Sequence, residues 1–445
     1  MVKSTTIFEC SNCGAQAAKW AGQCQECGKW NTMVEQVSGA SSKRGVVSAA
    51  VGKLLSINDV EGSEAKRIQT GIAELDRVLG GGIVAGEVVL MIGEPGIGKS
   101  TLLTQLALSP QIAIDQSKSV VYVCGEESPS QVKLRVERLQ TKNGAKKSAA
   151  NLQMLSETDV DVIVSTLEKN ALSMVIVDSV QTLYTTALTG MAGNVGQIRE
   201  CTARLIAYAK SKNVPVVLVG HVTKDGEMAG PKVLEHMVDV VLELTGDRYH
   251  DLRLLRTQKN RFGATDEVGV FRMDESGMVE VANPSEVFLS EREESGAGSC
   301  VTVVMEGTRP VLVEVQALVV GSELPVPRRV AQGVDVRRVQ ILLGVLQKHA
   351  RVALADKDVF VKITGGLNVK EPAIDLAICM AVASSVSGKP LSKTAAAVGE
   401  VGLLGEIRSV TFLAKREKEA KKLGYTSFYS RDNCKKVSEL VKLLR

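Results

Sequence analysis

Gly93-Glu94-Pro95-Gly96-Ile97-Gly98-Lys99-Ser100 is the stretch that decides the fold of this 445-residue chain. It follows the apolar run 88–92, which predicts a buried strand, and it precedes 101–107, which predicts the first turns of a helix. Strand, G-x-x-x-x-G-K-S and helix in this order indicate a phosphate-binding loop. The alternative is a glycine-rich turn with a chance lysine, but all four fixed positions are filled and both flanking elements are present.

The loop predicts a site for ATP and Mg²⁺. Its glycines let the backbone curl so that successive N–H groups point at phosphate oxygens, and the helix N-terminus adds partial positive charge. Lys99 is expected to contact the β- and γ-phosphates, and the Ser100 hydroxyl is expected to ligate Mg²⁺. The expected nucleotide-binding residues are Gly93, Glu94, Pro95, Gly96, Ile97, Gly98, Lys99, Ser100 and Thr101.

Three later apolar runs each predict a strand that ends near the triphosphate, where open α/β sheets place their ligands. The first is followed by Glu126 and Glu127, and a carboxylate here can orient the attacking water. We favour Glu126 and expect the other glutamate to be a solvated turn residue. The second ends in Asp178, which is expected to polarise the Mg²⁺-bound water. The third ends in His221, which is either a sensor of the γ-phosphate or a hydrogen-bonded histidine without such a role.

Two segments that follow consecutive predicted strands resemble the loops that line the central channel of RecA-type rings and filaments. They are 185–197, which is poor in large side chains and predicts a mobile loop, and 223–232. Lys224 and Lys232 of the second segment are candidates for contacts with DNA phosphates. Ordinary surface loops are the alternative interpretation.

A basic turn, Lys259-Asn260-Arg261-Phe262-Gly263, follows a predicted strand that begins at Leu252. Because Lys259 and Arg261 are two residues apart in an extended segment, their side chains are expected to point the same way. In an oligomeric ATPase, two such cations can stabilise charge on the phosphoryl group transferred in a neighbouring subunit. The alternative is a basic turn that only touches solvent.

Four cysteines near the start of the chain form two C-x₂-C pairs; they are Cys10, Cys13, Cys24 and Cys27. Their spacing predicts a tetrahedral Zn²⁺ site, and metal binding would supply most of the folding free energy of so short a module. A redox-active pair is the alternative. Trp20 and Trp30 lie in the same module and are expected to shield the metal.

Length and composition limit the remaining possibilities. A chain of 445 residues is too long for one ordinary core, so two or three domains are expected. Hydrophobic content of 44% and charged content of 23% are typical of a globular protein in water. The absence of a long apolar run and of a secretory signal predicts a cytoplasmic protein without a membrane partner. The net charge of +4 neither demands nor excludes a nucleic-acid partner.

These observations predict an α/β protein with four segments. Residues 1–36 form a zinc finger, 37–56 a Ser/Gly-rich basic linker, 57–282 an ATPase core and 283–445 a smaller α+β domain. The stretch 68–83, with three glycines before the phosphate-loop strand, resembles the start of RecA-like ATPase cores. The core is therefore expected to have the RecA-like P-loop fold with a mostly parallel sheet.

Taken together, these features resemble the RadA (Sms) family of bacterial DNA-repair proteins over essentially the whole chain. The pentapeptide KNRFG at 259–263 is the most specific part of the resemblance. The resemblance implies a hexameric, DnaB-like, DNA-dependent ATPase and helicase that acts on single-stranded and branched DNA. It further implies action with the RecA recombinase in recombination, repair and the stress response, by branch migration and heteroduplex extension.

The resemblance also implies that 283–445 is similar to the Lon protease domain, from which it departs at the catalytic positions. Ala373 stands after Pro372 where Lon-type proteases carry the nucleophilic serine, and the lysine position falls near Ala414, beside Lys415. Because alanine offers no nucleophile, peptide hydrolysis is not expected. An ATP-dependent protease is therefore disfavoured, and a KaiC-like regulatory ATPase that acts on protein partners remains the alternative function.

Overall fold

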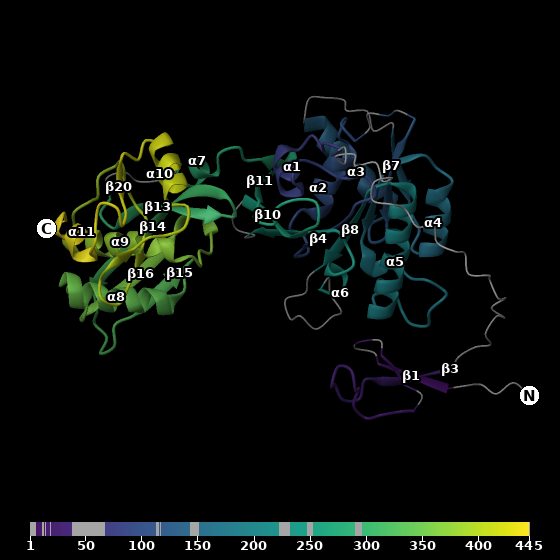
Figure 1. The fold of residues 1–445 in the computed structure, drawn as a ribbon, viewed down its shortest axis with the longest axis horizontal. Coiled ribbons are helices and arrows are strands. Elements are labelled where there is room, and N and C mark those ends of the chain that lie inside the picture. Colours follow the sequence, from purple (N-terminus) through teal and green to yellow (C-terminus); the bar gives the residue numbers. More distant parts are fainter. Residues whose placement is uncertain are drawn as a thin grey trace, which may run out of the picture. The chain divides into compact units, whose positions relative to one another are not determined.

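The computed structural model describes residues 6–10, 13, 15–17, 19–37, 67–112, 115, 117–142, 151–221, 232–246, 252–289 and 296–444 (Figure 1). The predicted linker beyond residue 37 and the candidate DNA contact Lys224 lie outside these residues. The chain divides into two compact units, Met1–Glu280 and Val281–Arg445.

A nine-stranded sheet forms the centre of the first unit, in the order β12-β11-β10-β9-β4-β8-β7-β5-β6. The parallel strands are β4 (Val88–Gly93), β5 (Ser119–Cys124), β6 (Leu152–Leu155), β7 (Leu172–Asp178), β8 (Val216–His221) and β9 (Val240–Gly246). The antiparallel strands β10 (Leu252–Asn260), β11 (Val268–Asp274) and β12 (Gly277–Glu280) extend one edge. The predicted mostly parallel α/β core is therefore confirmed.

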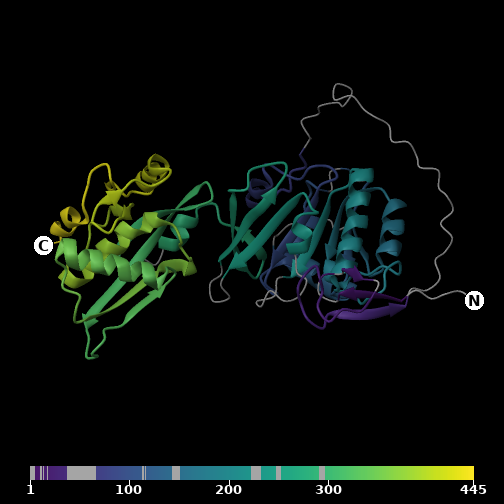
Figure 2. The same ribbon diagram turned by 60° about the horizontal axis from the view of Figure 1, so that its bottom comes forward.

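Helices cover both faces of this sheet (Figure 2). The helices of the first layer are α1 (Ala73–Leu79), α2 (Lys99–Ala107) and α3 (Pro129–Lys142). Those of the second layer are α4 (Val160–Glu168), α5 (Val195–Lys212) and the four-residue α6 (Lys232–Glu235). Strand β4 is buried on both sides, because Val89 and Met91 pack in the first layer while Val88 and Leu90 pack in the second.

The predicted mobile loop 185–197 is tied to helix α5 instead. Its last three residues are helical, and Thr185 is buried. The Gln197 side chain accepts a hydrogen bond from the Thr185 N–H at 2.8 Å and donates to the carbonyls of Leu188 and Gly190 at 3.1 and 3.2 Å. The glutamine amide supplies the fixed contacts that the small side chains of this segment lack.

The N-terminal module is a three-stranded antiparallel sheet of order β2-β1-β3. Its strands are β1 (Thr6–Cys10), β2 (Gln16–Ala17) and β3 (Met33–Val37). Cys10, Cys24 and Met33 form its small buried core, with Phe8 packed against them. So few apolar side chains leave a bound metal as the main source of folding free energy.

The second unit is α+β, as predicted. Its six-stranded sheet has the order β15-β16-β14-β13-β17-β20, beside a two-stranded ribbon, β18-β19. The strands are β13 (Ser299–Glu306), β14 (Arg309–Gly321), β15 (Arg329–Gln332), β16 (Lys357–Ile363), β17 (Ala395–Ala397), β18 (Glu400–Val401), β19 (Ile407–Arg408) and β20 (Ser427–Tyr429). The helices are α7 (Pro284–Leu289), α8 (Val336–Ala350), α9 (Asp375–Ser387), α10 (Leu413–Lys422) and α11 (Val437–Lys442).

Candidate active site

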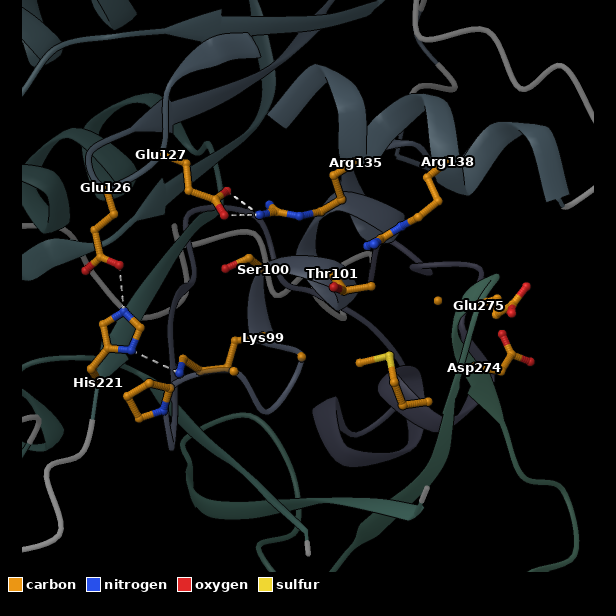
Figure 3. A pocket seen from close by; sticks show the side chains of 15 residues that line it. Lys99, Ser100, Thr101, Glu126, Glu127, Arg135, Arg138, His221, Asp274 and Glu275 are labelled. Atoms are coloured by element: carbon orange, nitrogen blue, oxygen red, sulfur yellow. Dashed lines mark hydrogen bonds and ion pairs between the residues drawn. The ribbon is translucent and has the colours of Figure 1, made fainter. Parts of the chain in front are cut away.

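The phosphate loop connects β4 to α2 and lines a cavity of about 690 Å³ (Figure 3). Gly96 and Gly98 have φ angles of 76° and 117°, which L side chains rarely adopt. A Cβ at Gly98 would lie 2.6 Å from the Met273 Cε, so this methionine side chain would have to shift as well. The loop can therefore curl closely around a ligand only with glycine at these positions.

Lys99 lies on the floor of the cavity and is 3% exposed. Its ammonium donates to the carbonyls of Gly93 and Glu94 at 2.8 and 3.0 Å and to the Nδ1 atom of His221 at 3.2 Å. Burial lowers the pKa of Lys99, and the carboxylates of Asp178 and Glu126 partly offset this effect. The lysine is thus held in the position from which it would meet a phosphate group.

His221 bridges the lysine and an acidic residue (Figure 3). Because an ammonium group has only donors, the Nδ1 atom accepts from Lys99, and the Nε2–H donates to the Glu126 Oε2 at 3.0 Å. The Ser179 hydroxyl donates to the other Glu126 oxygen. The hydrogen bond from His221, followed by that from Ser179, holds the pKa of Glu126 below its ordinary value, so the carboxylate is ionised at neutral pH.

Asp178 ends β7 beside this group and is 4% exposed. The Tyr122 hydroxyl donates to its Oδ2 at 2.5 Å. One ligand atom from each of Glu126, Asp178 and His221 can be chosen so that all three lie within 4.8 Å of one another. Two carboxylates this close together suit a divalent cation.

The two candidate glutamates after β5 have different partners. Glu126 faces His221 and Lys99, whereas the carboxylate of Glu127 forms an ion pair with Arg135 of α3 (Figure 3). The predicted preference for Glu126 as the water-orienting residue agrees with this arrangement. Glu127 is not the solvated turn residue that was expected, because its carboxylate is held by the helix.

Several residues that line the cavity were not predicted. Arg135 and Arg138 lie one turn apart on α3. Two arginines at this spacing, in a basic helix directly after β5, could have indicated that they point to the same site. Met273, Asp274 and Glu275 come from the turn between β11 and β12. No local sequence feature predicts that this turn lines the cavity. Only the pairing of β10 with β11 and β9 brings it to the phosphate loop.

The basic pentapeptide 259–263 lies at the opposite end of the same sheet. Asn260 pairs with Val240 across β10 and β9. Val240 pairs with Val89 at the start of β4, whereas Gly93 at the other end of β4 pairs with Leu244. The pentapeptide therefore begins about four strand residues, or about 13 Å, from the end at which the phosphate loop begins.

Both cations of the pentapeptide contact the short segment that follows α6. The Lys259 ammonium donates to the carbonyls of Glu235 and Val238, each at 2.8 Å, and more weakly to that of His236 at 3.4 Å. Arg261 donates to the Asp239 carboxylate at 3.3 Å. The side chains thus point to one segment, in line with the expected shared direction.

Asp239 is the centre of the contacts at this end of the sheet. It is 3% exposed and also accepts from the Val88 N–H at 3.0 Å and from the Lys210 ammonium. Phe262 lies under Lys210, with 5.8 Å between the ammonium and the ring centroid. Neither Asp239 nor Lys210 was predicted, since 22 and 51 residues separate them from Arg261.

Within the described residues, Lys232 is the one candidate DNA contact. It is the first residue of α6, and its side chain is exposed. Its position places an exposed cation one helical turn before the carbonyl of Glu235.

The four cysteines of the N-terminal module are brought together as predicted. All four Sγ atoms lie within 4.8 Å of one another; they belong to Cys10, Cys13, Cys24 and Cys27. Two of the Sγ–Sγ distances are 3.7 and 3.5 Å. Ligands at 2.3 Å from a tetrahedral Zn²⁺ would be about 3.8 Å apart, so this site fits zinc. Burial above all raises the pKa of Cys13 to about 12, so a cation is needed to hold its thiolate form.

The tryptophans of this module do not shield the metal, contrary to expectation. Trp20 is 59% exposed and Trp30 is 70% exposed. Their rings converge above Gly22, where an added Cβ would lie 3.7 and 3.6 Å from them. The buried core around the sulfurs is made by Met33 and Phe8 instead, because β1 and β3 bring these side chains over the site.

The Lon-like catalytic positions carry no reactive pair. Ala373 is buried, and Ala414 is exposed at the start of α10. The space between β13 and α10 is occupied by Arg416, which is fully buried and donates to the Glu371 carboxylate at 2.6 and 3.0 Å and to the Val303 carbonyl at 2.6 Å. An ion pair between the buried Arg416 and the partly exposed Glu371 thus lies two residues from Ala373, the position at which Lon-type proteases carry the serine.

Among the helices in the described part of the chain, none combines the length and the apolar character needed to cross a bilayer.

Comparison with known proteins gives two family matches and close full-length relatives. The family described as "AAA domain" matches residues 56–227, and "Rubredoxin metal binding domain" matches residues 8–35. The chain is 47% identical to the DNA repair protein RadA of Bacillus subtilis over 430 residues, which covers 96% of this chain and 92% of that protein. It is 46% identical to the DNA repair protein RadA of Listeria monocytogenes, with coverage of 96% and 92%. It is 45% identical to that of Streptococcus pyogenes serotype M6, with coverage of 97% and 94%.

Among solved structures, the RadB recombinase aligns with 48% of this chain and 99% of its own, at 24% sequence identity and a TM-score of 0.39.

Proposed function

The chain belongs to the RadA family of DNA repair proteins, and we propose that it is a DNA-dependent ATPase and helicase. In this proposal it acts with the RecA recombinase on single-stranded and branched DNA, in branch migration and heteroduplex extension. The observation that carries the proposal is the convergence of Lys99, Glu126 and His221 on the cavity beside the phosphate loop, with the buried Asp178 next to Glu126 and His221.

The residues of the cavity fit Mg²⁺ and ATP. Gly98 has no Cβ, so the loop leaves space for a phosphate group, and the Lys99 ammonium lies at the floor of the cavity. Backbone N–H groups at the start of α2 would hold the phosphates, while Ser100 and Asp178 would hold the metal ion. Bound Mg²⁺ and ATP supply the phosphoryl group and the charge that neutralises it.

Lys99 would exchange partners when a nucleotide binds. Its present acceptors are the carbonyls of Gly93 and Glu94, which are weak partners for an ammonium group beside a triphosphate. A lysine partly desolvated in this way interacts strongly with developing charge on the γ-phosphate.

Glu126 is the residue that we assign to the attacking water. Its depressed pKa keeps it ionised, and hydrogen bonds from His221 and Ser179 fix its orientation. A fixed carboxylate can accept a hydrogen bond from water and direct the oxygen lone pair at phosphorus. Because His221 also contacts Lys99, the geometry favours its role as a sensor of the γ-phosphate.

Lys259 and Arg261 are assigned to the active site of a neighbouring subunit. The length of β4 separates them from the phosphate loop of their own chain, so they cannot reach their own nucleotide. A heterologous contact, in which this end of one sheet meets the phosphate-loop end of the next, generates a closed ring when the rotation between subunits closes. We propose the homo-hexamer as that ring and place the protein in the cytoplasm.

DNA is assigned to the side of the ring that carries Lys224 and Lys232, where cations would neutralise phosphates. The Lon-like unit is assigned to ring assembly and not to peptide hydrolysis. Ala373 has no nucleophile, and the ion pair of the buried Arg416 with Glu371 fills the neighbouring space.

Turnover of ATP measured with and without single-stranded DNA tests the function, together with extension of a RecA-formed joint between two labelled DNA molecules. We expect DNA to raise the rate of hydrolysis and ATP to be required for extension of the joint. Hydrolysis that is indifferent to DNA, with no salt-sensitive DNA binding, would contradict the proposal.

A further inference from the structure

Helix α6 and the turn behind it form a short element that grips the cations of the pentapeptide. Within five residues, 235–239, three backbone carbonyls accept from Lys259 and one carboxylate accepts from Arg261. The element is attached to the core by Leu234, which is 1% exposed and packs in the layer that includes α4 and α5. The contacts between this element and the two cations thus depend on the packing of α6 against the core.

An irregularity in β10 directs Lys259 to this element. The register of β10 against β9 shifts between Thr257 and Lys259, as in a β-bulge. Thr257 is buried and donates to the Val78 carbonyl of α1, on the first face of the sheet. Without the extra residue, Lys259 would share that face, because side chains alternate along a strand. The bulge instead turns it toward the carbonyls behind α6.

The two cations are held differently. An ammonium group has three donors, and all three of those on Lys259 meet carbonyl oxygens of its own chain, one of them weakly. Arg261 makes one side-chain contact with Asp239, and its side chain is 54% exposed. With five donors on its guanidinium group, Arg261 can be positioned by Asp239 and still contact a partner. Lys259 can contact a partner only after it leaves these carbonyls.

Burial and the nearby Arg261 lower the pKa of Lys259, so its charge is already destabilised where it lies. A neighbouring triphosphate would offer the ammonium a better partner than neutral carbonyls. The exchange requires that the three hydrogen bonds from Lys259 to the carbonyls of 235, 236 and 238 break.

We propose that α6 and the following turn, residues 232–239, hold Lys259 back from the neighbouring subunit until DNA binds beside α6. Lys232 begins this helix, three residues before the first carbonyl that accepts from Lys259. DNA phosphates bound at Lys232 displace α6, the carbonyls move apart, and Lys259 is released to the nucleotide across the interface. Arg261 stays on Asp239 and is in place throughout. This inference rests on the proposed function, since it explains how DNA stimulates hydrolysis.

The first test loosens α6 in the full-length protein. Leu234→Ala removes the anchor, so we expect hydrolysis without DNA to rise and the ratio of stimulated to basal turnover to fall by at least about fivefold, a common size of coupling. Lys259→Met in the same background should remove the rise. The matched control is Ile163→Ala, which truncates an equally buried side chain of α4 in the same apolar layer and should leave the ratio unchanged.

An unchanged ratio in Leu234→Ala, or a rise that persists with Lys259→Met, would overturn the inference. If the wild-type protein shows no stimulation by DNA, the proposed function fails instead, and the two failures are distinguishable.

A second test needs no variant. An amine-reactive reagent is added to the wild-type protein, and acylation of Lys259 is compared with that of Lys133, an exposed lysine of α3, by mass spectrometry. We expect the rate at Lys259, relative to that at Lys133, to rise once single-stranded DNA is added without nucleotide. No change in this ratio on addition of DNA would contradict the release of Lys259 from the carbonyls behind α6.

Discussion

The two ends of the ATPase sheet are built in different ways. At the phosphate-loop end, polar side chains follow the carboxyl ends of neighbouring parallel strands and meet in an open cavity. At the other end, Asp239 and the carbonyls behind α6 bind Lys259 and Arg261 in close contacts within the same chain. The first end is open to a ligand, whereas the cations of the second end are bound by their own chain.

Lys259 and Arg261, which we propose to be catalytic, therefore lie at the end of the sheet away from the phosphate loop of their own subunit. Val88 at the start of β4 contacts Asp239, whereas Gly93 at its end opens the phosphate loop. In our proposal, a single strand therefore connects the site that binds nucleotide to the site that acts on the nucleotide of the next subunit. The following predictions test the two ends in order of expected effect.

The largest effect is expected from Lys99→Ala at the cavity floor. This change removes the ammonium that contacts the Gly93 and Glu94 carbonyls at the floor of the cavity, so kcat should fall by at least about 10²–10³-fold. ATP hydrolysis by the purified variant, measured with saturating DNA, checks the prediction. As a control, the unchanged thermal unfolding midpoint would show that the fold persists. Turnover within tenfold of wild type would remove Lys99 from the mechanism.

Much of the phosphate-loop end could be predicted from the sequence, because each functional residue lies next to a recognisable strand. The loop is contiguous, and Glu126, Asp178 and His221 each stand at or just beyond a strand end. Arg138 and the turn with Asp274 were missed at this end. A turn 175 residues away reaches the loop only through strand pairing, which the sequence does not encode locally.

The opposite end was predicted only in part. The pentapeptide stood out as a motif, but its partners Asp239 and Lys210 did not. Asp239 is a single acidic residue before an apolar strand, and its role depends on three segments that meet at this end of the sheet. The fold class and the zinc site were predicted correctly, because hydrophobic periodicity and cysteine spacing are properties of short stretches. The similarity of the second unit to the Lon protease domain stays a prediction.

The next effect separates the two glutamates of the phosphate-loop end. Glu126→Gln should lower kcat by about 10²-fold, because the amide cannot accept a proton from water as a carboxylate does. Glu127→Gln is the matched control; it loses the ion pair with Arg135 and should cost less than about tenfold. Single-turnover hydrolysis of each variant distinguishes them. Equal losses would mean that the assignment of the water-orienting residue is wrong.

A smaller effect concerns stability at the other end of the sheet. Burial raises the pKa of Glu87 from the ordinary 4.5 to about 7, and one of its carboxylate oxygens is buried without a hydrogen-bond partner among the described residues. Because the folded state holds this proton more tightly, stability is highest below pH 4.5 for this group and falls as pH rises toward 7. The loss integrates to at most about 3 kcal/mol.

Glu87→Gln should abolish this contribution, so the free energy of unfolding would depend less on pH between 4.5 and 7 than in wild type. Urea unfolding at a series of pH values measures it. Glu243→Gln, a change at a partly exposed position of β9, serves as the control for removing one carboxylate. Identical pH dependence in Glu87→Gln and wild type would contradict the buried, protonated state of Glu87.

The central claim is that one subunit supplies Lys259 to the phosphate loop of the next, and mixing two inactive variants tests it most directly. Lys99→Ala retains the pentapeptide, whereas Lys259→Ala retains the phosphate loop. In an equimolar mixture with random assembly, about a quarter of the interfaces combine an intact loop with an intact pentapeptide. The account predicts that DNA-stimulated hydrolysis reappears in the mixture although each variant alone has almost none. A mixture no more active than the sum of its parts would contradict it.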